Sequence, residues 1–170
     1  MPLGSAEALA LTGMMGSGKS RVAATLARLL RRRLVSTDDE VVRRAGKPIA
    51  RLFDEEGEPA FRALERHVVA ASAGPVVLDL GGGAFCDAAS AVRLLSTARV
   101  VFLDVSSVVA ERRLGAGAPG SRPLAARWEQ LLRARLPLYR RAHHTVAVGT
   151  LSPEAVARHI LGWLADARAR

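Results

Sequence analysis

The chain has 170 residues, of which 49% are hydrophobic and 24% are charged, as in a globular domain that buries a substantial core. No apolar run approaches the roughly 18 residues that a membrane-spanning helix needs, so we expect no membrane partner. The formal net charge is +9, but only 4% of the residues are aromatic, which leaves no stacking platform for single-stranded nucleic acid.

Short apolar segments alternate with helical patterns along the chain. The segments predicted to form strands are residues 8–12, 33–36, 75–80, 99–105 and 144–148. After the first of them, Val22, Leu26 and Leu29 recur at helical spacing. This alternation predicts an α/β fold, with right-handed crossovers and a parallel sheet that helices cover on both faces. Ligands of such sheets bind at the carboxyl ends of the strands.

The segment after the first predicted strand fits the P-loop pattern G-x-x-x-x-G-K-[ST] at every fixed position. It consists of Gly13, Met14, Met15, Gly16, Ser17, Gly18, Lys19 and Ser20. Its glycines let backbone N–H groups turn toward phosphate oxygens, and the following helix adds its positive N-terminal end. Lys19 is expected to reach the β- and γ-phosphates, and the Ser20 hydroxyl to coordinate Mg²⁺. The pattern predicts a protein that binds a nucleoside triphosphate, and a compact kinase is the simplest interpretation.

Residues 114–127 form the one segment rich in glycine, proline and alanine. The glycines favour a mobile loop, and the arginines favour a loop that closes over an anion. A plain surface connection is the alternative. The single cysteine, Cys86, excludes an intramolecular disulfide and is typical of a cytoplasmic protein.

Further motifs follow the P-loop in order, namely "TD", "FRALE", "GGG", "SRPL" and "RLPLY". Together with "GMMGSGKS", they make the sequence resemble the shikimate kinases over nearly the whole chain, from Ala8 to about Leu164. The resemblance implies a three-layer α/β/α P-loop kinase fold, with a five-stranded parallel sheet in the order 2-3-1-4-5. It also implies a single domain over 1–170, with a core (1–36, 75–113 and 140–170), a helical substrate-binding segment (37–74) and a mobile lid (about 114–127).

The function that the resemblance implies is ATP-dependent phosphorylation of the 3-hydroxyl of shikimate, with ATP and Mg²⁺ as cofactors and shikimate as the small-molecule partner. We expect a monomer that binds no nucleic acid. The alternatives are a related kinase acting on gluconate or a cyclitol, a non-catalytic nucleotide-binding homologue, and a basic nucleic-acid-binding module. Two arginines placed for a carboxylate weigh against an uncharged cyclitol, because unpaired buried guanidinium groups are costly.

The resemblance assigns the catalytic roles to Asp38, Lys19 and Arg122. Asp38 would position or deprotonate the attacking hydroxyl, and Arg122 in the lid would stabilise charge on the transferred phosphoryl group. Arg113 and Pro153 would flank the adenine. The alternatives to these roles are that Asp38 caps the helix that begins there and that Arg122 is a solvated charge in a loop.

The substrate-binding residues that the resemblance implies are Asp38, Phe53, Phe61, Arg62, Gly81, Gly82, Gly83 and Arg135. The two arginines would clamp the carboxylate of shikimate, the glycines would let the substrate approach backbone N–H groups, and the two phenylalanines would pack on its ring. The alternative for Arg62 is a surface ion pair with Glu65, and the alternative for Arg135 is a bystander on a basic helix.

One position departs from the pattern of the family. The second strand of these kinases usually ends in D-x-D, whose first acid supports the magnesium shell, but this chain has Ser36-Thr37-Asp38. The third predicted strand carries Asp79, where the family often has a small hydroxyl residue. Since neighbouring strands lie about 4.8 Å apart, we hypothesise that the hydroxyl and the carboxylate have exchanged strands. On this hypothesis Asp79 joins Ser20 at the metal, with Ser36 as a minor candidate. The alternative is that Asp79 is an ordinary Walker B acid and that the kinase acts on another substrate.

Overall fold

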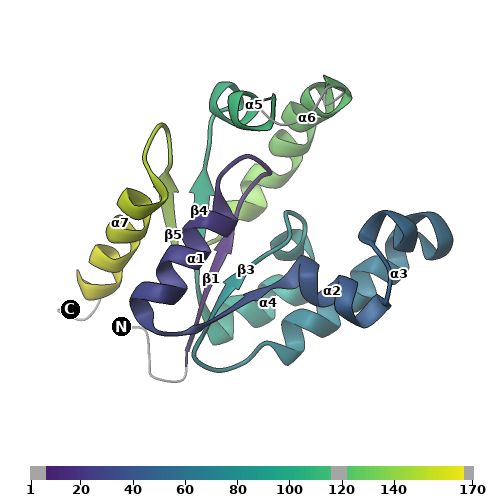
Figure 1. Ribbon diagram of the computed structural model, residues 1–170, viewed down its shortest axis with the longest axis horizontal. Helices are drawn as coiled ribbons and strands as arrows, with labels where there is room; N and C mark the ends of the chain where they lie inside the picture. The colour runs from purple at the N-terminus through teal and green to yellow at the C-terminus, as the bar shows by residue number, and fades with distance from the viewer. Residues whose placement is uncertain (1–6, 116–121, 167–170) are drawn as a thin grey trace.

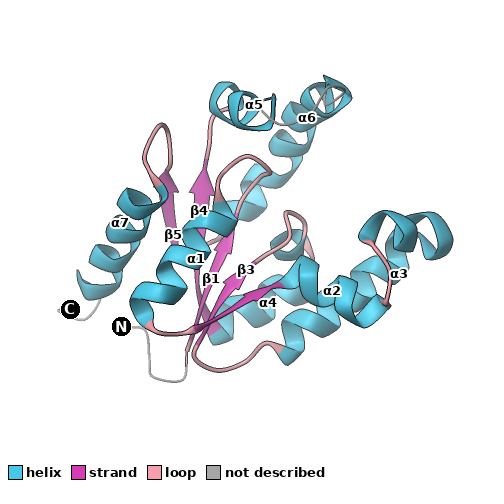
Figure 2. Ribbon diagram, in the orientation of Figure 1, coloured by secondary structure: helices cyan, strands magenta, loops and turns pink. Residues whose placement is uncertain are grey.

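A computed structural model describes residues 7–115 and 122–166 of the chain, with side chains for residues 7–114 and 128–166. Its strands are β1 (Ala8–Thr12), β2 (Arg33–Ser36), β3 (Val76–Asp79), β4 (Ala98–Asp104) and β5 (His144–Ala147). They form one parallel sheet in the order β2-β3-β1-β4-β5 (Figure 1, Figure 2). The predicted strands, their parallel pairing and their order are confirmed.

Helices cover both faces of this sheet. They are α1 (Lys19–Leu30), α2 (Thr37–Ala45), α3 (Ile49–Ala71), α4 (Ala88–Thr97), α5 (Ser107–Gly115), α6 (Arg122–Tyr139) and α7 (Pro153–Asp166), with a short 3₁₀ turn η1 (Ala84–Cys86). Successive strand side chains point to opposite faces, so Leu9 and Leu11 pack with α1 and α7, whereas Ala8 and Ala10 pack with α4 and α6. No described helix combines the length and the apolar character that crossing a membrane requires.

Helices α2 and α3 project from one edge of the sheet, beside β2 (Figure 1). They enclose a small apolar cluster of their own, built from Val41, Leu52, Phe61 and Val68. Helix α3 consists of two helical pieces, because Gly57 has the non-helical angles φ 80° and ψ 171°. Proline is favoured in the first turn of a helix, and Pro59 begins the second piece in this way.

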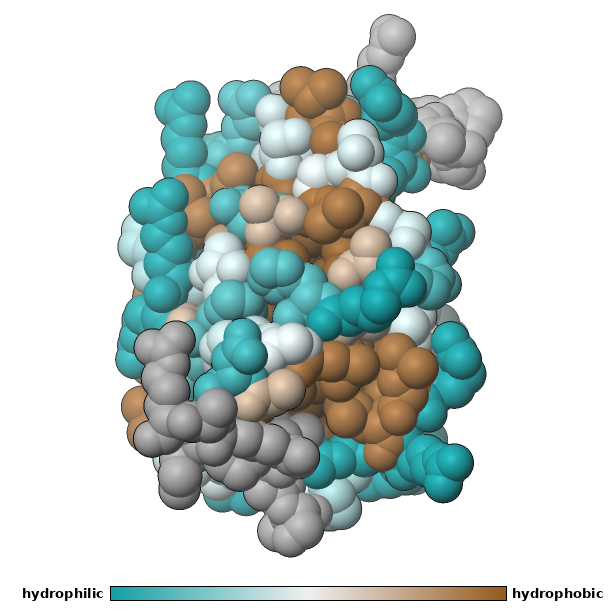
Figure 3. All heavy atoms as spheres, turned by 90° about the vertical axis from the view of Figure 1, so that its left-hand side faces the viewer, coloured by the Kyte–Doolittle hydropathy of each residue, from teal (hydrophilic) through white to brown (hydrophobic). Residues whose placement is uncertain are grey.

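The carboxyl ends of the strands point toward the side of the sheet where α5 and α6 lie (Figure 2). The P-loop follows β1 at this edge, and the glycine loop (Gly81–Gly83) follows β3. The side of the molecule formed partly by α7 carries separate apolar areas divided by polar side chains (Figure 3). The fold therefore gathers the predicted functional segments at the carboxyl edge of the sheet.

Candidate active site

The P-loop has the backbone conformation that its sequence pattern predicts. Gly13, Gly16 and Gly18 have φ angles of 144°, 81° and 85°. At Gly16 a side chain is also excluded by packing, because a Cβ atom there would lie 3.0 Å from the Cα atom of Ala110. No side chain caps the N-terminus of α1. That helix end can therefore receive a phosphate.

The ammonium group of Lys19 lies over the P-loop. Its Nζ atom donates to the carbonyl oxygens of Gly13 at 2.9 Å and Met14 at 3.2 Å. Burial lowers the pKa of Lys19, and the carboxylates of Asp79 and Asp38 act in the opposite direction. The lysine is held where a phosphate would take over its hydrogen bonds.

A cavity of about 680 Å³ opens beside the P-loop. Its walls away from the P-loop comprise Arg112, Arg113, Val148, Leu151, Pro153 and Val156, and α1 adds further residues. The guanidinium group of Arg113 donates to the carbonyl oxygens of Gly16 at 3.2 Å, Ser17 at 3.1 Å and Gly149 at 3.2 Å. Arg113 therefore joins the P-loop to the loop before α7, and it lines the same cavity as Pro153.

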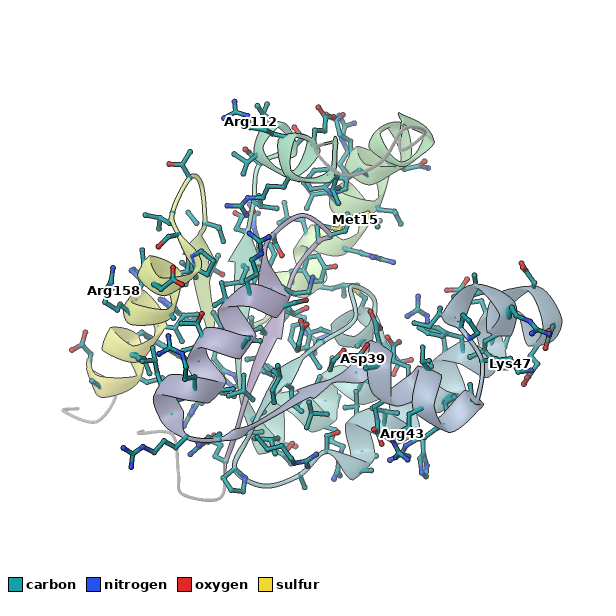
Figure 4. All side chains as sticks on the ribbon, in the orientation of Figure 1. Met15, Asp39, Arg43, Lys47, Arg112 and Arg158 are labelled. Atoms are coloured by element: carbon teal, nitrogen blue, oxygen red, sulfur yellow. The ribbon has the colours of Figure 1, made fainter. Side chains whose placement is uncertain are left out.

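A second cavity, of about 330 Å³, adjoins the first and shares Met15, Lys19 and Ser20 with it. Met15 lies on the side of the P-loop that is next to α6 (Figure 4). The remaining lining residues are Ser36, Asp38, Ile49, Phe61, Arg62, Glu65, Asp79, Leu80, Gly81, Gly82, Gly83 and Arg135. We call this space the acceptor cavity. It brings together every predicted substrate-binding residue except Phe53, which packs behind the ring of Phe61 at a centroid distance of 4.7 Å.

Arg62 takes part in an ion-pair network that joins a buried carboxylate to an exposed one. It donates to Glu65 at 2.7 Å and to the exposed Glu58 at 3.1 Å. The interpretation of Arg62 and Glu65 as a surface pair is wrong, because the Glu65 side chain is only 2% exposed. Burial raises the pKa of Glu65, although Arg62 opposes this shift. One carboxylate oxygen of Glu65 is buried without a hydrogen-bond partner among the described residues.

Asp38 lies at the base of the acceptor cavity, close to the first glycine of the glycine loop. A Cβ atom at Gly81 would overlap the carboxylate of Asp38 and would lie 3.0 Å from Oε1 of Glu65. A Cβ atom at Gly83 would likewise overlap the guanidinium group of Arg62. Burial raises the pKa of Asp38, the carboxylate of Asp79 adds to this shift, and Lys19 opposes it. A raised pKa suits a carboxylate that accepts a proton from a hydroxyl group.

Ser36 and Asp79 stand directly opposite each other in the parallel register of β2 and β3. The hydroxyl group of Ser36 accepts a hydrogen bond from the backbone N–H of Asp39 at 3.2 Å, and Ser36 is the N-cap of α2. The interpretation of Asp38 as the helix cap is therefore wrong. Asp79 makes no such helix-cap contact and lines the acceptor cavity together with Ser20 and Lys19.

Three residues that the sequence analysis gave no role also shape the site. The Thr37 hydroxyl accepts the N–H of Gly81 at 2.7 Å and lies 3.4 Å from the carbonyl oxygen of Asp79. The Trp128 indole donates to the carbonyl oxygen of Met15 at 3.1 Å. The Tyr139 hydroxyl donates to the carbonyl oxygen of Gly82. In the sequence, Thr37 belongs to the motif "TD" and Tyr139 to the motif "RLPLY", whereas Trp128 belongs to none of the motifs.

The middle of the predicted lid lies outside the described residues, and the backbone at its two ends belongs to α5 and α6. The backbone of Arg122 begins α6, but its side chain is not among those described, nor are residues 116–121. The role of Arg122 and the closure of the lid stay predictions.

The donor set at the junction of the two cavities fits a magnesium ion. Mg²⁺ keeps several waters and binds through one or two carboxylates together with the phosphates of its nucleotide. The Ser20 hydroxyl and the Asp79 carboxylate provide hard oxygen donors beside the P-loop lysine. The described residues contain no cluster of three or more His, Cys, Asp or Glu side chains suited to a metal. Such a cluster is not needed for a metal ion whose coordination shell is completed by the phosphates of the nucleotide and by water.

Comparisons with known proteins agree with this geometry. The family model described as "Shikimate kinase" matches residues 15–165. A shikimate kinase of Thermobifida fusca is 42% identical over 158 residues, covering 88% of this chain and 90% of the relative. A shikimate kinase of Streptomyces avermitilis is 42% identical over 159 residues, covering 89% of this chain and 91% of the relative. The solved structure of a shikimate kinase from Acinetobacter baumannii in complex with shikimate superposes with a TM-score of 0.90 at 30% identity, covering 98% of this chain and 97% of that one. The chain belongs to the shikimate kinase family.

Proposed function

We propose that this chain transfers the γ-phosphoryl group of ATP to the 3-hydroxyl of shikimate, with the larger cavity for the nucleotide and the acceptor cavity for shikimate. One observation supports the assignment of this function to the residues of the two cavities. The two cavities meet at Lys19 and Ser20, and the second contains two guanidinium groups and a carboxylate with a raised pKa. A carboxylate-bearing polyol matches that combination of charges.

In the nucleotide cavity, the P-loop N–H groups and the end of α1 bind the phosphates, and Lys19 exchanges its bonds to the Gly13 and Met14 carbonyls for phosphate oxygens. Arg113 and Pro153 flank the adenine. A bound Mg²⁺ supplies positive charge that neutralises the phosphates, with Ser20 and Asp79 as its protein partners and Ser36 as a lesser candidate. Arg122 adds positive charge from the lid.

In the acceptor cavity, Arg62 and Arg135 bind the carboxylate of shikimate, and Phe61 contacts its ring, with Phe53 supporting Phe61 from behind. Asp38 accepts the proton of the attacking hydroxyl, for which its raised pKa suits it. Catalysis consists of positioning and charge stabilisation, because phosphoryl transfer asks for little covalent chemistry from the protein. Residues of one chain line both cavities, which supports a monomer as the functional unit.

The test is release of ADP by the purified protein with MgATP, in the presence of shikimate, gluconate, a neutral cyclitol or no acceptor. We expect strong release with shikimate alone. Turnover with gluconate in its place would assign a different acceptor, and binding of ATP without any acceptor-dependent turnover would indicate a non-catalytic homologue. A steep salt dependence of binding to nucleic acid would be the signature of the remaining alternative.

A further inference from the structure

The carbonyl oxygen of Gly82 receives two donors from α6. The hydroxyl group of Tyr139 donates to it at 2.5 Å, and Nη1 of Arg135 donates to it at 3.3 Å. The two side chains are four residues apart, so they share a face of the helix. One helix turn of α6 thus holds one peptide group of the glycine loop.

The other polar groups of the glycine loop are unevenly satisfied. The carbonyl oxygens of Gly81 and Gly83 accept backbone N–H groups from η1, at 3.0 Å and 2.9 Å. The N–H of Gly81 donates to Thr37 at 2.7 Å. Within residues 7–115 and 122–166, the N–H groups of Gly82 and Gly83 have no acceptor. All three carbonyl groups are therefore engaged by the protein, and two N–H groups remain available beside the acceptor cavity.

The direction of the Gly83 N–H follows from the geometry of the peptide bond. The bond between Gly82 and Gly83 is trans and planar, so its N–H points away from its C=O. The C=O points toward α6, where it accepts from the buried Tyr139 and from Arg135, which lines the acceptor cavity. Gly82 and Gly83 do line that cavity. The Gly83 N–H therefore points away from α6, at a position that lines the acceptor cavity.

Tyr139 is itself held firmly. Its ring stacks on Phe102 of β4 with centroids 5.0 Å apart and an interplanar angle of 22°. Its hydroxyl lies 3.7 Å from the sulfur of Met14 in the P-loop. Burial raises the pKa of Tyr139, so the hydroxyl keeps its proton and remains a donor. The hydroxyl position is fixed by the sheet and the P-loop rather than by the substrate.

We propose that Tyr139 is a positioning residue for the acceptor, whose hydroxyl fixes the Gly82–Gly83 peptide so that the Gly83 N–H donates to an oxygen of shikimate. Arg135 lines the cavity, and in the proposed function it binds the substrate carboxylate. This leaves Tyr139 as the donor that holds the Gly82 carbonyl. The inference rests on the proposed use of the acceptor cavity for shikimate.

The kinetic test is Tyr139→Phe, which keeps the stacked ring and removes only the hydroxyl group. We expect KM for shikimate to rise about three- to tenfold, the effect of one lost hydrogen bond, with kcat and KM for ATP nearly unchanged. Ser72→Ala is the matched control, since it removes a hydroxyl-to-carbonyl bond of 2.8 Å at the end of α3, outside both cavities. It should leave both KM values as in the wild type.

A spectroscopic test observes the peptide directly. Among the 15 glycines, only Gly82 and Gly83 follow another glycine. Protein labelled with [1-¹³C, ¹⁵N]glycine therefore gives two amide signals in a carbonyl-filtered spectrum, which triple-resonance experiments assign. Shikimate should shift the Gly83 signal downfield in the wild type and much less in Tyr139→Phe.

Three results would overturn the inference: equal increases in the two KM values, an unchanged KM for shikimate in Tyr139→Phe, or a Gly83 signal that responds to shikimate equally in both proteins. The first would mean that Tyr139 acts through the P-loop. Failure of the proposed function itself is distinguishable, because the wild type would then show no shikimate-dependent release of ADP and no response of either glycine signal.

Discussion

The hypothesis that the hydroxyl of Ser36 and the carboxylate of Asp79 have exchanged strands leads to a prediction about magnesium. Asp79→Asn preserves the shape of the side chain and removes its charge. Asp79 lines the acceptor cavity with Ser20, whereas the hydroxyl of Ser36, its register partner, is engaged by the Asp39 N–H at 3.2 Å. We therefore expect Asp79→Asn to weaken Mg²⁺ affinity and activity about 10- to 100-fold, the usual effect of losing a group that supports a metal site.

Ser36→Ala should behave differently, since it removes the N-cap of α2. We expect about 1 kcal/mol lower stability toward unfolding and little change in Mg²⁺ affinity. The double variant Asp79→Ser with Ser36→Asp returns one carboxylate to the same pair of strands, and it should recover most of the lost affinity. Asp104→Asn is the matched control, because Asp104 ends β4, is half-buried like Asp79 and lines neither cavity.

The assay is binding of Mn²⁺ in the presence of ADP, followed by the electron paramagnetic resonance signal of free Mn²⁺, together with ADP release over a range of Mg²⁺ concentrations. The binding readout does not depend on turnover. Metal affinity in Asp79→Asn equal to that of the wild type would refute the reasoning. So would a loss in Ser36→Ala as large as the loss in Asp79→Asn.

Three further predictions concern the acceptor cavity. Gly81→Ala should abolish turnover of shikimate and leave ATP binding intact. The added Cβ atom would overlap the Asp38 carboxylate, whereas Gly81 does not line the nucleotide cavity. ADP release checks the turnover, and titration with nucleotide checks the ATP binding. Asp38→Asn should lower kcat at least about 100-fold and raise Tm. The Tm should rise because a carboxyl group whose pKa is raised on folding destabilises the folded state, and this effect is complete at pH values above the raised pKa. A lower Tm in thermal unfolding at neutral pH would contradict this. For the same reason kcat/KM of the wild type should fall on acidification at a higher pH than an ordinary aspartate would give, as a pH–rate profile would reveal.

The sheet could be predicted from the sequence because its determinants are local. Each strand is a short apolar run, and the P-loop fixes both its own conformation and the start of α1. The N-cap of α2 is equally local, since Ser36 and Asp39 have the S-x-x-[DE] spacing of a capping box. Asp38 is also of a residue type that commonly caps helices, so the sequence alone left two candidates.

The supporting contacts of the site could not be predicted, because they join distant segments. Thr37 meets Gly81 across 44 positions of the sequence, and Tyr139 meets Gly82 across 57. The burial of Glu65 depends on how α3 packs beside the glycine loop, which a helical pattern alone does not specify. Motif order located the groups that face the cavity, and tertiary packing determined those that hold them in place.

The contact between Trp128 and the P-loop makes the protein its own optical probe. A buried indole bonded to the Met15 carbonyl changes its emission when the P-loop rearranges around a nucleotide. The second of the two tryptophans, Trp163, stacks on His144 on the opposite side of the sheet, with centroids 4.6 Å apart. Burial lowers the pKa of His144, so quenching of Trp163 by a protonated imidazole begins only below the usual range of histidine. At neutral pH the unlabelled protein thus carries one fluorophore that responds to the nucleotide site and another that serves as an internal reference.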